Sequence, residues 1–282
     1  MCTKNVKKLA ELIRCASTTL APDVVRALEK AREREQAGSG AETTLGVILE
    51  NASLAASAAV PICQDTGTLS FWFDLPNGEN PVEYEDAVKE AVREATRGGY
   101  LRLNAIETLS GAQVADNVAE GNPSVHFRFG EFKQPRVSLL MKGGGSENMS
   151  RQYSLPDENL NPGRDMDGVR KCVLDAVWRA QGNGCAPGIL GVCLGGDRAT
   201  GFEKAKEQLL RPLDDVNALA DLAAAETRLT DEANSLEIGP MGLGGKTTLL
   251  GVKICAAARL PASYFVTVAY CCWACRRVSI VL

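Results

Sequence analysis

The sequence predicts an α+β fold in which a helical amino-terminal region packs on a sheet-containing core. Near the start of the chain, "VKKLAELIRCA" and "DVVRALEKAREREQ" carry apolar residues at helical spacing. Further along, "SVHFRFG" and "RVSLLMKGGG" alternate or run apolar as strands do. Helical patterns then return before the last strand patterns, so the chain mixes helices and strands along its length.

The elements expected in the first half follow from these patterns. About residues 1–60 are expected to be helical, and "AETTLGVILENASLAASAAV" is apolar enough to predict a buried helix. A strand is expected near Phe71, and after it comes an amphipathic helix, "EYEDAVKEAVREATRGG", which a glycine pair closes. A further strand is predicted near Val137, just before a run of glycines.

In the second half, "DGVRKCVLDAVWRAQGNG" predicts a helix that ends at Gly184, and "GILGVCLGG" predicts a buried strand. Residues 203–234 predict helices joined near Pro212. The last region predicts two more strands, so the strands of this half are centred near Leu190, Leu249 and Phe265. Residues 151–165 are the best candidate for a linker between domains. A loop within one domain is an equally good interpretation of this segment.

Composition and charge exclude several classes of protein. A chain of 282 residues, of which 45% are hydrophobic, can bury a sizeable core. Its 31 basic and 35 acidic residues give a net charge of −4, which argues against a nucleic-acid-binding surface. Charges interrupt the first apolar run, unlike a secretory signal, and no stretch reaches the roughly 18 apolar residues of a membrane span. We therefore expect a cytoplasmic protein.

The chain contains ten cysteines. In the cytoplasm thiols stay reduced, so metal-binding or catalytic roles are favoured over disulfides. Most of the cysteines are still expected to pack as small hydrophobic residues in apolar or helical surroundings: Cys2, Cys15, Cys172, Cys193 and Cys255. Three others lie at turns or strand ends: Cys63, Cys185 and Cys272. Three thiolates can hold a four-iron cluster with one open iron, although this spacing is not a ferredoxin pattern.

Cys272 and Cys275 also satisfy C-x-x-C, for which redox and zinc interpretations exist. Zinc is the poorer interpretation, because there is no second C-x-x-C and the chain has one histidine, His126. His126 lies in a strand-like segment, where a packed or hydrogen-bonded side chain is expected rather than a metal ligand.

Glycine-rich turns border strand-like segments at "KGGGSEN", "NGCAPGILGVCLGG" and "IGPMGLGGKTT". Each alone is explained by turn chemistry, since glycine tolerates positive φ. The last is not a phosphate loop, because Pro240 stands where the first glycine of G-x-x-x-x-G-K-[ST] belongs. A site for a nucleoside triphosphate is therefore excluded.

Six segments spread over residues 62–277 resemble, in this order, the alpha subunit of the two-subunit class I iron–sulfur fumarate hydratases and their tartrate dehydratase relatives. They are "ICQDTG", "LRLNA", "KGGGSEN", "GNGCAPGILGVCLGG", "IGPMGLGGKTTLLGVKI" and "VAYCCWACRR". The resemblance implies that residues 1–282 form an alpha-type hydro-lyase domain. It also implies that Cys63, Cys185 and Cys272 carry a 4Fe–4S cluster whose open iron binds substrate and which is easily lost in air.

Hydration of a dicarboxylate needs carboxylate anchors, a metal for the hydroxyl and a group that moves a proton. Gln64 is expected to donate a hydrogen bond to substrate, and Asp65 to accept or relay the proton. Arg102, in "LRLNA", matches a family arginine that clamps the distal carboxylate. The backbone N–H groups of Gly144 and Gly145 would serve the other end of the substrate. The alternatives are that Asp65 caps a turn and that Arg102 is a solvated charge.

The form "KGGGSEN" resembles that of the fumarate hydratases, so the expected reaction is the reversible hydration of fumarate to malate. Two alternatives stay open: the alpha subunit of an L-tartrate dehydratase, and a non-catalytic cluster-binding or interaction protein. The resemblance implies a separate beta subunit and an alpha dimer within a heterotetramer. Neither nucleic acid nor membrane is expected as a partner, and the chain is expected to be inactive alone.

Overall fold

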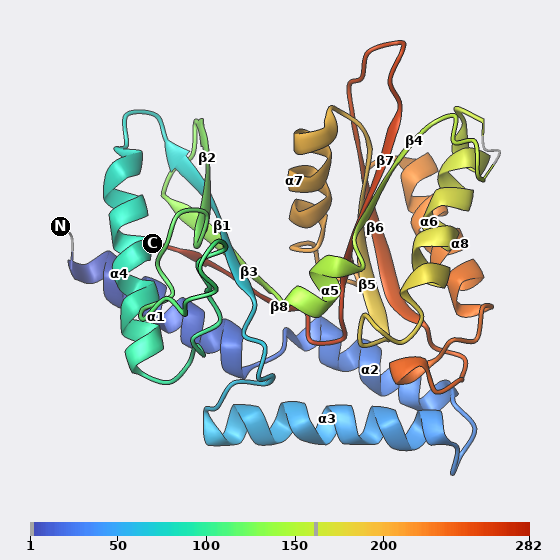
Figure 1. The fold of residues 1–282 in the computed structure, drawn as a ribbon, viewed down its shortest axis with the longest axis horizontal. Helices are drawn as coiled ribbons and strands as arrows, with labels where there is room; N and C mark the ends of the chain where they lie inside the picture. The colour runs from blue at the N-terminus through green and yellow to red at the C-terminus, as the bar shows by residue number, and fades with distance from the viewer. Residues whose placement is uncertain (1–2, 161–162) are drawn as a thin grey trace. The chain divides into compact units, whose positions relative to one another are not determined.

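The computed structural model describes residues 3–160 and 163–282; Cys2 and residues 161–162 of the linker candidate lie outside the described residues. The chain forms two compact units (Figure 1). The first comprises Met1–Ala21, Glu50–Gly144 and Arg276–Leu282, and the second comprises Pro22–Leu49 and Gly145–Cys275. No helix within the described ranges has both the length and the apolar character needed to cross a membrane.

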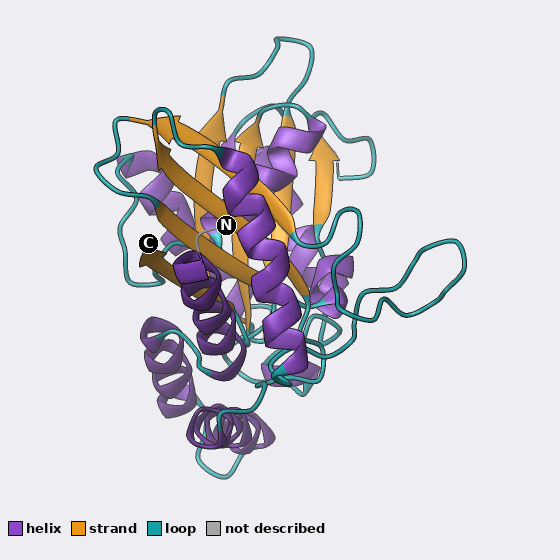
Figure 2. Ribbon diagram, turned by 90° about the vertical axis from the view of Figure 1, so that its left-hand side faces the viewer, coloured by secondary structure: helices purple, strands orange, loops and turns teal. Residues whose placement is uncertain are grey.

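The first unit contains α1 (Thr3–Thr18), β1 (Thr68–Pro76), α4 (Pro81–Arg97), β2 (Ser124–Gly130), β3 (Arg136–Lys142) and β8 (Arg276–Val281). Its four strands form a sheet in the order β2-β1-β3-β8. Strand β1 runs parallel to β2 and antiparallel to β3, and β3 runs antiparallel to β8. Helices α1 and α4 lie along one face of this sheet (Figures 1 and 2), where they bury its apolar side chains.

Local sequence explains why these elements form. In β1, Leu69, Phe71, Phe73 and Leu75 alternate with more polar positions, so one face of the strand is buried against the helices. Helix α4 starts after Asn80, whose side chain accepts a hydrogen bond from the Val82 N–H, and it has proline in its first turn. It ends at the predicted glycine pair, where Gly99 has a φ of 77°.

The antiparallel order places three chain segments at one end of this sheet. Strand β1 begins where β3 ends, with Thr68 opposite Lys142, and β8 begins there too, with Arg276 opposite Met141. The "CQDT" run before β1 and the glycine run after β3 therefore meet at this sheet end.

The second unit contains α2 (Pro22–Arg34), β4 (Arg151–Ser154), α6 (Met166–Ala180), β5 (Gly188–Gly195), α7 (Arg198–Gln208), α8 (Ala220–Asn234), β6 (Leu249–Ala257) and β7 (Phe265–Cys271). Its sheet has the order β4-β7-β5-β6, in which β5 and β6 are parallel. Helix α7 lies on one face of the sheet and α6 and α8 on the other (Figure 1). Every residue of β5 is buried, as predicted, because helices cover both faces.

The remaining helices are α3 (Gly40–Ala58), α5 (Gly144–Asn148) and the 3₁₀ turn η1 (Pro240–Gly242). The sequence predicted a buried helix for α3, but only one face of this helix is buried. Val47 is 59% exposed and Leu54 is 60% exposed, so the helix buries only part of its surface. The many alanines in this segment give it an apolar composition. Alanine occurs on both buried and exposed faces of helices, so composition alone did not show which face is packed.

Three other expectations differ from the structure. Helix α6 ends at Ala180 instead of Gly184, because Gln181 adopts a positive φ of 46°. The linker candidate contains β4, which pairs with β7 and so belongs to the second unit. The carboxyl-terminal region forms three strands rather than two, since "RRVSIV" is strand β8. His126 lies in β2 as predicted, where it stacks on Trp72 with ring centroids 5.1 Å apart.

Candidate active site

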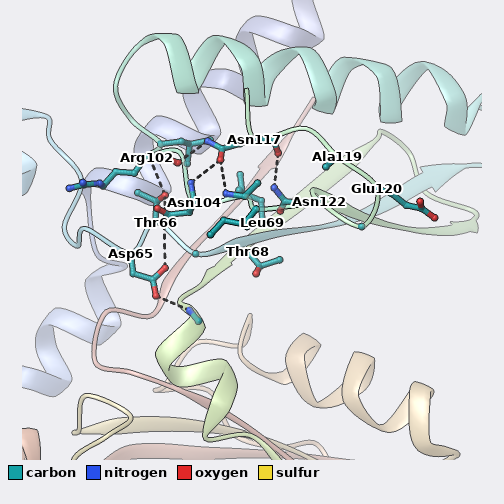
Figure 3. A pocket seen from close by; sticks show the side chains of 16 residues that line it. Asp65, Thr66, Thr68, Leu69, Arg102, Asn104, Asn117, Ala119, Glu120 and Asn122 are labelled. Atoms are coloured by element: carbon teal, nitrogen blue, oxygen red, sulfur yellow. Dashed lines mark hydrogen bonds between the residues drawn. The ribbon is translucent and has the colours of Figure 1, made fainter. Parts of the chain in front are cut away.

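A cavity of about 290 Å³ lies in the first unit, within the loops at the sheet end where β1 begins. Residues of the segments 65–69, 101–106 and 117–122 line it, together with Gly144. Figure 3 shows Asp65, Thr66 and Asn104 close together on one side of it. Drug-sized ligands occupy cavities of roughly 300–1,000 Å³, so this cavity suits a smaller molecule.

Asp65 is held by two donors from separate segments of the chain. Its Oδ2 accepts a hydrogen bond from the Gly144 N–H at 2.8 Å, and its Oδ1 accepts one from Asn104 Nδ2 at 3.4 Å. A Cβ on Gly143 would lie 2.9 Å from Asp65 Oδ2, so a larger residue there would displace the carboxylate. Gly143 is thus needed for close approach, and Asp65 is oriented by more than its own turn.

Thr66 and Gly67 shape the connection that presents Asp65. Thr66 is 1% exposed, and its Oγ1 accepts hydrogen bonds from the Arg102 N–H at 3.2 Å and from Asn104 Nδ2 at 3.3 Å. Gly67 has a φ of 79°, and a Cβ there would lie 2.6 Å from the carbonyl carbon of Lys142. Glycine is required at this position both by the backbone conformation and by the neighbouring strand.

Asn117 organises the loop that carries Arg102 and Asn104, and sequence reasoning missed it. Its Oδ1 accepts from the N–H groups of Asn104 and Ala105, each at 3.1 Å. Its Nδ2 donates to Thr96 Oγ1 at 3.1 Å and to the Arg102 carbonyl at 2.8 Å. The residue is buried and has a φ of 61°, which asparagine tolerates better than most residues. The one signal in the sequence was a stretch rich in Asn, Asp and Gly, "ADNVAEGN".

Replacing Asn117 with alanine should therefore lower the free energy of unfolding by about 2–4 kcal/mol, because it leaves two backbone N–H groups without their acceptor. Urea or thermal unfolding followed by circular dichroism measures this change. The matched control is Asn77→Ala, since Asn77 is an exposed residue of a turn. Equal stability of the two variants would contradict the role of Asn117 as the organiser of this loop.

Arg102 is one of the residues that line the cavity. It is exposed, and within the described part of the chain its guanidinium has no carboxylate partner. Figure 3 shows its side chain extending away from Asn117 and Asn122. The structure thus brings Arg102, Asp65 and Gly144 to one cavity. Gln64 and Gly145 are exposed and are not among its lining residues.

The backbone N–H groups were expected to serve the substrate directly. The Gly144 N–H instead donates to Asp65, so in this structure it positions the carboxylate. Gly145 lies in the first turn of α5, a helix of 5 residues.

Two of the three predicted cluster ligands lie together in the second unit. Cys185 sits in a turn, with its N–H donating to the Gly182 carbonyl at 3.0 Å and a φ of 52°. The Trp273 N–H donates to the Cys185 carbonyl at 3.3 Å, which brings Cys185 next to Cys272 in the fold. Both thiols are half-buried, as is that of Cys63, which belongs to the first unit.

Glycines let this thiol-bearing turn pack tightly. Side-chain atoms of Tyr270 occupy the space that a Cβ on Gly184 or Gly188 would need. A Cβ on Gly182 would lie 2.5 Å from the carbonyl oxygen of Met241, within the third glycine-rich stretch. These glycines are needed for close approach, beyond the turn chemistry expected of each stretch alone.

The other cysteines have different surroundings. Cys172, Cys193, Cys271 and Cys275 are buried, and Cys15 and Cys255 are half-buried. Hydrogen bonds with the thiols of Cys272 and Cys275, together with burial, raise the pKa of Cys271. Burial raises the pKa of Cys172 to about 12, so this thiol stays protonated and unreactive. Across residues 3–160 and 163–282, no group of three or more His, Cys, Asp or Glu side chains is arranged to hold a metal ion.

Comparisons with known proteins agree with this arrangement of motifs. Residues 6–281 match the family described as fumarate hydratase (Fumerase). The chain is 47% identical over 280 residues to a putative fumarate hydratase class I of Geobacillus stearothermophilus, covering 98% of the chain and 54% of that relative. It is 34% identical to a putative L(+)-tartrate dehydratase subunit alpha of Methanocaldococcus jannaschii, covering 95% of the chain and 94% of the relative. With the L(+)-tartrate dehydratase subunit alpha of Escherichia coli K12 it shares 30% identity, covering 98% and 91%. The chain thus spans about half the length of the Geobacillus relative.

Proposed function

The chain belongs to the fumarate hydratase family, and on that premise we propose that it is the alpha subunit of an iron–sulfur hydro-lyase that reversibly hydrates fumarate to malate. The observation that carries the proposal is the pairing of Asp65 and Arg102 in one small cavity. A carboxylate that can move a proton and a cation that can bind a carboxylate are the groups this reaction needs.

Residues of this chain would bind the substrate and move a proton. The Arg102 guanidinium binds one substrate carboxylate, for which its planar pair of donors is suited. Asp65 accepts or relays a proton, and the Gly144 N–H and Asn104 hold its two oxygens in place. Gln64 donates a hydrogen bond to a substrate oxygen. Gly145 offers a backbone N–H beside Gly144.

Cys63, Cys185 and Cys272 would hold the 4Fe–4S cluster. The donor set fits it, because all three are half-buried thiols, and Cys185 lies next to Cys272 in the second unit. A fully buried arginine, Arg276, also has guanidinium nitrogens without partners among the described residues, which fits an anion bound nearby. When bound, the cluster supplies Lewis-acid chemistry toward the hydroxyl that is added or removed.

A beta subunit would complete the enzyme. Two of the relatives are named as subunit alpha, and the Geobacillus relative is nearly twice as long as the region that this chain matches. We propose that the beta subunit contributes further substrate-binding groups and a base, and that the alpha chains pair within a heterotetramer.

The cluster-loaded chain alone should therefore hydrate fumarate at a rate near background. Loss of a positioned acid or base removes about 10²- to 10⁴-fold in rate, and loss of substrate orientation adds to that. The measurement is malate dehydration, followed by the absorbance of fumarate, after anaerobic reconstitution with and without a co-expressed beta-type chain. Full activity of the isolated chain would refute the divided site.

Tartrate is the second candidate substrate, because the two relatives named as subunit alpha are tartrate dehydratases. The higher identity to the fumarate hydratase relative, 47% against 34% and 30%, favours fumarate. A parallel assay with L-tartrate decides between them. A protein that only binds a cluster would need neither Asp65 nor Arg102, so turnover of either substrate excludes that alternative.

A further inference from the structure

Arg276 is the first residue of β8, at the sheet end where the candidate active site lies. It is 1% exposed and is among the largest fully buried side chains of the protein. Among the described residues, neither its Nε nor its Nη1 has a hydrogen-bond partner. Sequence reasoning assigned Arg276 no role.

The surroundings of Arg276 in the sheet are apolar. It lies directly opposite Met141 in β3, and Met141 lies opposite Leu69 in β1. These two neighbours are 0% and 2% exposed, and both belong to the apolar core of the first unit. The row across the three strands therefore supplies no acceptor for the guanidinium.

A guanidinium in such a place needs hydrogen-bond acceptors. Arginine stays protonated in proteins, so it cannot escape burial by losing its proton, as a lysine can. A buried charge without a partner strongly destabilises a fold. The buried nitrogens of Arg276 therefore indicate an acceptor that comes from outside the described residues.

We propose that Arg276 is a positioning residue whose guanidinium donates to the sulfur atoms of the iron–sulfur cluster, an inference that rests on the proposed function. Arg276 does not line the cavity that contains Asp65 and Arg102, so a resident group explains it better than a diffusing substrate. It follows Cys272 by four positions in the sequence, and hydrogen bonds to cluster sulfurs are an established way in which proteins tune such clusters.

The test is Arg276→Met, a flexible apolar replacement, measured in both states of the chain. Without the cluster, the variant should melt at least about 2 °C higher than the wild type, because an unpaired buried charge has been removed. With the cluster, the variant should lose iron to a chelator about 10- to 100-fold faster, as when partners around a metal site are removed. Arg276→Lys keeps the positive charge, so this variant should lose iron more slowly than Arg276→Met.

The matched control is Arg136→Met, which removes an exposed arginine from the other end of β3 and should change neither measurement. Iron loss from Arg276→Met at the wild-type rate would overturn the inference and leave the proposed function intact. A lower melting temperature of the cluster-free variant would also overturn it, because the guanidinium would then be satisfied within the fold. A wild-type chain that takes up no cluster with its beta partner would overturn the proposed function itself.

Discussion

Replacing Cys63, Cys185 or Cys272 with serine should each abolish the visible absorbance of the reconstituted cluster. Thiolates are the ligands of four-iron clusters, and a serine hydroxyl stays protonated near neutral pH. Hydratase activity measured with a beta partner should fall with the absorbance. Iron and acid-labile sulfide per chain give a second measurement that does not depend on turnover.

The control for these variants is Cys15→Ser. Cys15 is half-buried in α1 and has a thiol, but it is not a proposed ligand. Its variant should keep the full absorbance. A cluster that survives serine at any of the three proposed positions would show that the ligand set is wrong, provided that the variant still folds by circular dichroism.

Replacing Asp65 with asparagine should lower kcat by about 10²- to 10⁴-fold in the cluster-loaded complex. Asparagine retains an oxygen that can accept the Gly144 N–H, so the loop geometry is largely preserved while the proton acceptor is lost. The cluster absorbance should be unchanged, which separates loss of proton transfer from loss of the cofactor. Steady-state malate dehydration is the measurement.

Asp74→Asn is the matched control. Asp74 lies in β1, the strand that follows Asp65, and its carboxylate forms an ion pair with Arg128 at the surface. That variant should keep kcat within about threefold, since exposed ion pairs contribute little. An Asp65→Asn enzyme with comparable activity would exclude Asp65 as the group that moves the proton and would leave it as a turn residue.

Much of the fold could be predicted from short-range patterns. The helices over residues 3–34 and 81–97 and the buried strand β5 have clear periodicity or long apolar runs. Strand β8 was missed because it begins with two arginines, a residue type that is usually exposed to solvent. Both arginines are buried in the structure, a fact that only pairing with β3 reveals.

The family motifs, the mixed fold class and the local order of polar groups around Asp65 could be recognised from the amino-acid sequence. Which of these groups meet depends on how the chain folds. Asn117 donates a hydrogen bond to the carbonyl of Arg102, which lies 15 positions away in the sequence. The Gly144 N–H donates to Asp65, which lies 79 positions away. The physical reason is that hydrogen bonds and steric limits act between neighbours in space, whereas motifs report neighbours along the chain. Gly143 shows the difference: the glycine-rich pattern predicted a turn, and in the fold the lack of a side chain at Gly143 lets the Asp65 carboxylate approach the backbone.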